Sequence, residues 1–289
     1  MDHHTRRRLV LAAASHAERL RMTCGINQCE AIDPIGIAQQ RGCEVRYMPL
    51  PSLEGIYSPV PGPVIVVGSQ RPAGRRAYTC AHELGHHEFR HGTQVEELIS
   101  EERNMAKAPD EFLADMFAAC LMMSQSSIRY ALKVRGFDVK KIEPMQIFSM
   151  ASFFGVGYTT LIDHLALTLM QINQQQRDYL KRVKPKDLKA IFGGEAQSEV
   201  FIADEFWRGR PVDMEVGDIL VLQTGSILED NSRLSEYEVS RSQPIFKAIS
   251  RGYARAFHEG SGWSINIRIA PKQYEGLAQH RFLDDPEED

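Results

Sequence analysis

The chain of 289 residues lacks a basic excess, since 38 acidic residues outnumber 34 lysines and arginines and the net charge is −4. A protein that neutralises phosphates over its whole surface usually carries a clear basic excess, so the charge gives no support to general nucleic-acid binding. The sequence also lacks any run of about 18 apolar residues, the length that a transmembrane helix requires. We therefore expect an ordinary globular protein with no membrane partner.

Cysteine is scarce, with five residues and no Cys-x-x-Cys pair. An odd number without such a pair argues against a disulfide framework or a structural zinc ribbon, and favours a reducing compartment.

The amino terminus imitates a signal peptide, because Arg6, Arg7 and Arg8 precede an apolar run. That run covers only residues 9–14, and a secretory core needs roughly 7 to 15 apolar residues. We expect an amphipathic helix at this end and a cytoplasmic protein.

The order of apolar and turn-forming residues predicts an α+β domain, mainly helical with a small sheet, followed by a β-rich region. We expect a Pro-rich turn between the first two strands and a loop or weak helix over residues 93–109. Asp33 and Asp110 are expected to cap the helices that follow them. Periodicity predicts helices at 8–22, 34–41, 77–89, 111–123, 128–134, 144–154 and 159–171, and strands at 43–48 and 64–67.

The pattern changes after Gly193 and Gly194, where short β-rich runs alternate with turn signals. We therefore expect three regions: a core over residues 1–125, a helical extension and linker over 126–192, and a β-rich accessory domain over 193–289. The acidic tail, residues 284–289, is expected to be frayed. The strands expected in the third region are 200–203, 219–223, 253–257 and 263–269.

A His-Glu-x-x-His motif, formed by His82, Glu83 and His86, lies in the expected helix 77–89. Four residues make about one helical turn, so both imidazoles project from one face and can bind one metal ion. Glu83 can reach the water that such a metal activates and act as general base. The pentapeptide alone is moderately specific, because an exposed His-rich helix can contain it by chance.

A catalytic zinc ion needs a third protein ligand and an open position. The longer motif that ends in a third histidine is excluded, because Phe89 and Gly92 stand where it requires Gly and His. The other common solution is a glutamate from a second helix, and Glu111 lies 25 residues beyond His86. Asp115, one turn later, is expected to accept a hydrogen bond from a ligating imidazole and fix its tautomer.

Other residues near the motif are weaker candidates. His87 and His91 are candidates for stabilising an oxyanion, although such histidines are more often surface residues. Cys80 and Cys120 lie on the two site helices, where small buried side chains are the commoner interpretation and an inhibitory thiolate the alternative. The glutamates that offer an alternative third ligand, although they resemble a solvated charge run, are Glu88, Glu96, Glu97, Glu101 and Glu102.

The sequence resembles the ImmA/IrrE metallopeptidases of bacteria, phages and mobile elements. The resemblance rests on residues 76–86 (RAYTCAHELGH) and 111–123 (EFLADMFAACLMM), and covers roughly residues 8–170. It implies a zincin-type fold with a gluzincin-like zinc site, and a helix-turn-helix transcriptional repressor as the protein substrate. Cleavage of that repressor would switch on genes for DNA-damage response, element excision or anti-phage defence. One departure is Met123-Ser124, which stands where the family often has a Pro after the Leu-Met pair; this affects helix termination more than chemistry.

Residues 151–162 follow the spacing of a helix-turn-helix. A DNA-reading helix needs cations and amides, whereas the expected second helix, residues 158–170, has no Lys or Arg and contains Asp163. A helical packing module is therefore favoured over a DNA reader. Nucleic acid stays open as an activating signal, and the basic run over residues 181–189 is the better candidate contact.

Two functions from different classes fit the sequence. The first is a zinc-dependent regulatory endopeptidase in which Glu83 moves a proton from water to the leaving amine. The second is a zinc-stabilised binding or sensor module that sequesters a repressor without hydrolysis, an alternative motivated by the large β-rich region. An intact Glu83 argues for the first, because a structural metal site has no use for a general base.

Overall fold

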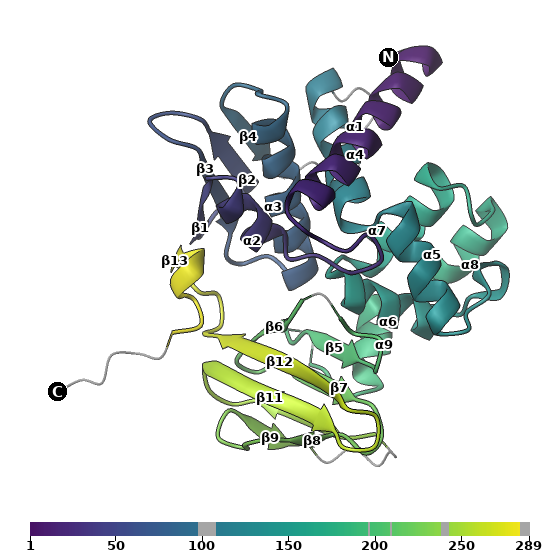
Figure 1. Cartoon of the computed structure of the whole chain (residues 1–289), viewed down its shortest axis with the longest axis vertical. Coiled ribbons are helices and arrows are strands. Elements are labelled where there is room, and N and C mark those ends of the chain that lie inside the picture. The colour runs from purple at the N-terminus through teal and green to yellow at the C-terminus, as the bar shows by residue number, and fades with distance from the viewer. Residues whose placement is uncertain (98–107, 196, 209, 238–242, 284–289) are drawn as a thin grey trace. The chain divides into compact units, whose positions relative to one another are not determined.

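The computed structural model describes residues 1–97, 108–195, 197–208, 210–237 and 243–283 (Figure 1). The chain divides into two compact units, Met1–Tyr130 with Glu275–Ala278, and Ala131–Tyr274 with Gln279–Asp289. Helices and small sheets occur in both units, which confirms the α+β class. The expected boundaries at residues 125 and 192 stay predictions about domains.

The first unit contains a five-stranded sheet in the order β13-β1-β3-β2-β4. β1 and β3 are parallel, with Val45 opposite Ile65, whereas β2 is antiparallel to both β3 and β4. β13 comes from near the carboxyl end of the chain and adds an antiparallel strand beside β1. The bounds are β1 (Glu44–Met48), β2 (Leu53–Ser58), β3 (Val64–Gly68), β4 (Gln94–Glu97) and β13 (Gly276–Leu277).

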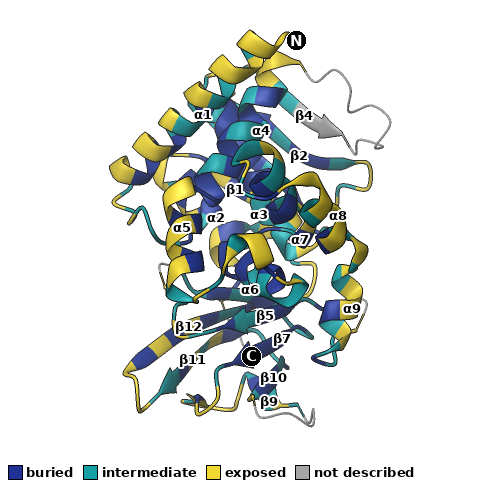
Figure 2. Ribbon diagram, turned by 90° about the vertical axis from the view of Figure 1, so that its right-hand side faces the viewer, coloured by how far each residue is buried: buried dark blue, intermediate teal, exposed yellow. Residues whose placement is uncertain are grey.

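Four helices accompany this sheet: α1 (His3–Thr23), α2 (Pro34–Gln40), α3 (Ala73–Glu88) and α4 (Pro109–Met122). α4 packs against both α1 and α3, and α3 also packs against β2 and β3. α1 leaves much of its length exposed (Figure 2). It begins earlier than expected because Asp2 caps it, accepting a hydrogen bond of 2.9 Å from the backbone N–H of Thr5.

A buried arginine ties the end of α1 to the end of α4. Arg21 is 0% exposed and donates hydrogen bonds to the backbone carbonyls of Leu121, Asn27 and Glu30. Burial lowers the pKa of Arg21 to about 10, so the guanidinium stays charged at neutral pH. The three carbonyl oxygens therefore receive a charged donor, the bond to Leu121 is buried, and α4 is held from its carboxyl end.

The second unit combines helices with two four-stranded sheets, in the orders β5-β7-β10-β9 and β6-β12-β11-β8. α5 (Gln125–Val134) leads into it from the first unit. The helical segments are η2 (Val139–Lys141), α6 (Pro144–Phe154), α7 (Tyr158–Asp163), η3 (His164–Thr168), α8 (Gln174–Arg182), α9 (Pro185–Ala190) and η4 (Ala278–His280). The strands are β5 (Val200–Ala203), β6 (Val212–Glu215), β7 (Ile219–Leu222), β8 (Ile227–Leu228), β9 (Leu234–Glu236), β10 (Ile245–Ala248), β11 (Gly252–His258) and β12 (Trp263–Ala270).

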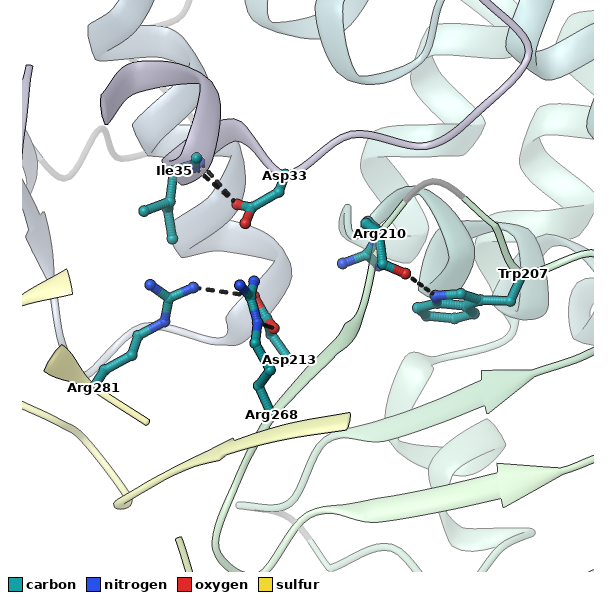
Figure 3. A network of polar contacts seen from close by, with 8 residues as sticks. Asp33, Ile35, Trp207, Arg210, Asp213, Arg268 and Arg281 are labelled. Carbon is teal, nitrogen blue, oxygen red and sulfur yellow. Dashed lines mark hydrogen bonds and ion pairs between the residues drawn. The ribbon is translucent and has the colours of Figure 1, made fainter. Parts of the chain in front are cut away.

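The helix-turn-helix-like segment, α6 with α7, is packed into the second unit at its turn. Arg210 donates to the backbone carbonyls of Ser152 and Phe153 at 2.8 and 3.0 Å. Trp207, whose indole N–H donates to the Arg210 carbonyl (Figure 3), lies edge-on to Phe153 with 5.9 Å between ring centroids. On α7, Asp163 is paired with basic side chains of α8. Side chains of its own unit therefore engage this segment, as a packing module requires.

Ion pairs also fasten the end of the second unit. Asp213 of β6 accepts from Arg268 of β12 at 2.7 Å and from Arg281 at 3.0 Å (Figure 3). Both guanidinium groups lie over the Phe282 ring, at 4.8 and 4.2 Å from its centroid. One carboxylate and one aromatic ring thus hold the segment that follows β13.

Three local expectations are wrong. Residues 53–58 form β2 rather than a turn, and Gly55 at its centre with prolines on both sides hides the strand pattern. Residues 94–97 form β4 rather than a loop or weak helix, while the rest of that stretch, 98–107, lies outside the described residues, as does the acidic tail 284–289. α4 begins at Pro109 with Ala108 as N-cap, so Asp110 lies inside its first turn, because proline suits the first helical position.

Among the described residues, no single helix is long and apolar enough to cross a membrane. One pair of helices, α6 with α7 and η3, reaches that length and composition together, but it bends by 103° at its middle.

Candidate metal centre

Two helices bring the three expected metal ligands together. His82 and His86 lie one turn apart on α3, both buried, with their Nε2 atoms 3.0 Å apart. Glu111, in the first turn of α4, places Oε2 at 3.3 Å from His82 Nε2 and Oε1 at 3.4 Å from His86 Nε2. These three residues are the one such cluster of possible metal ligands in the described part of the chain.

The spacing of these atoms fits a tetrahedral metal ion. Zinc binds nitrogen and oxygen ligands at about 2.0–2.2 Å, so two of its tetrahedral ligands lie roughly 3.3 Å apart. The observed separations of 3.0, 3.3 and 3.4 Å lie close to that value. Three ligands of this kind could hold one ion and leave a fourth position open.

The charge states of two ligands suit metal binding. Burial, followed by the neighbouring His82, lowers the pKa of His86 to about 4, so this imidazole is neutral at neutral pH. The hydrogen bond with His82 lowers the pKa of Glu111, so this carboxylate is ionised. A metal ion requires a neutral imidazole and an ionised carboxylate, and neither group has to lose a proton on binding.

Asp115 lies where it can orient His82. Its Oδ1 is 3.1 Å from His82 Nδ1, on the side of the ring opposite to Nε2. Tyr78 donates to the backbone carbonyl of Asp115 at 3.1 Å. If Nε2 binds the metal, Nδ1 carries the proton and donates it to Asp115, which selects one tautomer. This is the arrangement expected from the spacing of Glu111 and Asp115.

Glu83 is 0% exposed and lies against β2. A Cβ atom at Gly55 of β2 would stand 2.9 Å from Glu83 Oε1 and 2.5 Å from Thr79 Cγ2. Any side chain at position 55 would therefore displace the candidate general base. The requirement for glycine here is missed by sequence reasoning, because residues 53–58 are expected to form a turn.

The two candidate oxyanion stabilisers make other contacts. His87 Nδ1 is 3.1 Å from the hydroxyl of the buried Tyr57, on β2. His91 Nδ1 is 2.8 Å from His86 Nδ1, and its Nε2 is 3.7 Å from Asp110 Oδ1. Their role at an oxyanion stays a prediction, and Nδ1 of each ring is already engaged within the protein.

The alternative ligands lie elsewhere or outside the described part. Glu88 accepts from Arg41 at 2.7 Å and is 2.9 Å from His16 Nε2, so its carboxylate is engaged by other elements. Cys80 is fully buried, and burial raises the pKa of Cys120 to about 12, so the Cys120 thiol stays protonated at neutral pH. The remaining alternatives, whose residues or side chains lie outside the described part, are Glu96, Glu97, Glu101 and Glu102.

Comparison with known families matches residues 38–165 to the IrrE N-terminal-like domain, a peptidase family. A search of curated proteins finds no match. The matched range contains α3 and α4 with all three candidate ligands and Glu83. The match and the site geometry agree on a metallopeptidase-like domain. Residues 38–165 are therefore similar to the domain that characterises the ImmA/IrrE family.

Proposed function

We propose that this protein is a cytoplasmic, zinc-dependent endopeptidase that cleaves a helix-turn-helix transcriptional repressor and so derepresses stress, mobile-element or anti-phage defence genes. The observation that carries the peptidase assignment is the convergence of His82 and His86 of α3 with Glu111 of α4, with Glu83 beside the first ligand. The repressor as substrate is supported by the family resemblance.

Two imidazoles and one carboxylate are the ligand set of a large class of zinc peptidases. When bound, zinc would lower the pKa of a water molecule and polarise the scissile carbonyl. Glu83 would accept a proton from that water and deliver it to the leaving amine. Asp115 would keep His82 in the tautomer that binds through Nε2.

The position of Glu83 favours a peptidase over a zinc-stabilised module that sequesters a repressor. A metal site that serves only the fold needs no carboxylate beyond its ligands and their hydrogen-bond partners. Glu83 is not among the three clustered ligands, yet it is fully buried on the same helix. Burying a carboxylate is unfavourable, and a role as general base explains why a carboxylate occupies this buried position.

The test is cleavage of repressors encoded near this gene, with zinc-loaded wild type, Glu83→Gln, and Glu18→Gln as an exposed control on α1. We expect wild type and the control to cleave one such repressor into two fragments, identified by mass spectrometry. Glu83→Gln should retain zinc and lose cleavage by a factor of about 100 or more, the contribution of a general base. Full cleavage by Glu83→Gln would contradict the mechanism, and a stable complex between wild type and repressor without fragments would favour the sequestering module.

A further inference from the structure

The turn that ends α3 returns the chain over one of the metal ligands. The backbone N–H of His91 donates to the carbonyl of His86 at 2.9 Å, and that of Arg90 donates to the carbonyl of His87 at 3.1 Å. These two bonds, with Phe89 as the C-cap, form a Schellman motif. His91 is thereby placed beside the side chain of His86, five residues earlier in the sequence.

This turn carries backbone strain. Arg90 has φ of 58°, in the left-handed region that helix C-termini usually fill with glycine. A residue with a side chain is strained in that region. The turn therefore forms against a local preference, and the contacts of the next residue, His91, offset the strain.

The side chains of His86 and His91 are also hydrogen-bonded to each other. His86 Nδ1 lies 2.8 Å from His91 Nδ1, and the two ring centroids are 5.0 Å apart. The Phe89 ring stacks on His91, with 6.0 Å between the ring centroids, and the His91 side chain is only 10% exposed. His91 is therefore a packed side chain with a defined direction.

The direction of the hydrogen bond follows from the geometry of the site. Nε2 of His86 faces His82 and Glu111, at 3.0 and 3.4 Å. A metal bound there would take the Nε2 lone pair, so Nδ1 of His86 carries the proton and donates it to His91 Nδ1. His91 then carries its own proton on Nε2, which points to Asp110.

We propose that His91 is a positioning residue of the metal centre: it accepts the Nδ1–H of His86 and thereby fixes the orientation and tautomer of that ligand. This inference rests on the proposed zinc site. Each imidazole ligand then has its own acceptor, Asp115 for His82 and His91 for His86. A neutral imidazole in this place adds no negative charge to a site that already contains Glu111 and Asp115.

Two substitutions separate the hydrogen bond from the packing. His91→Phe keeps an aromatic ring against Phe89 and removes the acceptor. His91→Asn loses the ring and keeps a carbonyl oxygen at about the position of Nδ1. The measurement is the zinc dissociation constant of the full chain, by competition with a chromophoric chelator, with thermal unfolding of the zinc-free proteins followed in parallel.

We expect His91→Phe to weaken zinc binding by about 10–100-fold, as the loss of such an outer partner typically does. We expect His91→Asn to bind zinc within a few-fold of wild type, although it packs less well. Equal affinity of His91→Phe and wild type, or equal weakening by both substitutions, would overturn the inference while the zinc site stands. Absence of zinc binding in wild type would overturn the proposed function itself. If His91→Phe does not fold, His91→Ala tests the same loss of the acceptor.

Discussion

Gly85 of α3 lies against Ala114 of α4 so closely that a Cβ atom at position 85 would stand 3.1 Å from Ala114 Cα. The same atom would lie 3.1 Å from Phe117 Cδ1. Gly85 immediately precedes His86, and Ala114 lies one turn after Glu111. The close approach of the two helices at this point is what allows ligands from both to meet.

We therefore predict that Gly85→Ala weakens the metal site. Alanine favours a helix by about 1 kcal/mol over glycine, but overpacking a close helix contact costs about 1–3 kcal/mol, and two of the three contacts involve Ala114 itself. We expect a net loss of stability and weaker zinc binding, measured by urea unfolding and chelator competition. Gly92→Ala is the matched control, because a Cβ atom there meets nothing within 4 Å. Unchanged zinc affinity in Gly85→Ala would show that α4 adjusts without cost.

A second prediction concerns Gly55 of β2 and separates catalysis from metal binding. A methyl group at this position would push on Glu83 and Thr79, at 2.9 and 2.5 Å, and neither of these residues is among the clustered metal ligands. We expect Gly55→Ala to lower the cleavage rate by at least about 10-fold, since a displaced base loses much of its 10²–10⁴-fold contribution. Zinc content should stay near that of wild type. Gly62→Ala, which meets nothing within 4 Å, should have no effect on either quantity.

A third prediction concerns the buried Arg21. Methionine at this position keeps much of the length of the side chain and removes the guanidinium donor from the carbonyls of Leu121, Asn27 and Glu30. The Asn27 carbonyl keeps the backbone N–H of Glu30 as a donor, at 3.1 Å. The bond to Leu121 is buried, whereas those to Asn27 and Glu30 are part-buried, and a buried acceptor left unsatisfied costs about 1–3 kcal/mol. We expect Arg21→Met to lower the free energy of unfolding by about 1–3 kcal/mol in urea titrations, against little change for the exposed control Arg7→Met. A loss below about 1 kcal/mol would show that these bonds are dispensable.

A fourth prediction concerns pH and Asp218 in the second unit. This carboxylate accepts backbone N–H groups from Glu199 and Glu215, both at 2.8 Å, and burial raises its pKa from 3.8 to about 7. Between these two values the folded protein holds a proton that the unfolded chain has lost. Stability should therefore fall as pH rises from about 4 to about 7, by up to ~1.4 kcal/mol per pH unit, and level off above 7.

The measurement for Asp218 is urea unfolding at several pH values, followed by tryptophan fluorescence. Both tryptophans of the chain, Trp207 and Trp263, lie in the second unit, so their fluorescence reports on the unit that contains Asp218. Asp218→Asn should remove the contribution of this group to the slope. The same slope in wild type and in Asp218→Asn would assign the pH dependence to other residues.

Local signals made several elements predictable from the sequence. α6 has the expected bounds, residues 144–154, because Pro144 occupies its first turn and Gly155, with φ of 65°, ends it. The two motif helices could also be predicted. The spacing of His82 and His86 and that of Glu111 and Asp115 each correspond to about one helical turn. Side chains spaced in this way lie on one face of a helix, which is why a common site could be predicted for them.

The features that were missed depend on contacts between distant segments. β13 pairs Leu277 with Arg46 of β1, and no local pattern predicts a partner so far along the chain. The need for glycine at positions 55 and 85 arises from the approach of another element rather than from a turn. The position of His91 follows from a left-handed Arg90, a conformation for which arginine gives no sequence signal.

The zinc content of the purified full chain tests the metal centre most directly, measured by plasma mass spectrometry for wild type and for Glu111→Ala, with Glu18→Ala as the exposed control. We predict about one zinc ion per chain in wild type and in the control, since the site has three ligands and an open position. Glu111→Ala should contain far less, because it retains two of the three ligands. Zinc absent from wild type prepared without chelators, or undiminished in Glu111→Ala, would contradict the metal centre formed by His82, His86 and Glu111.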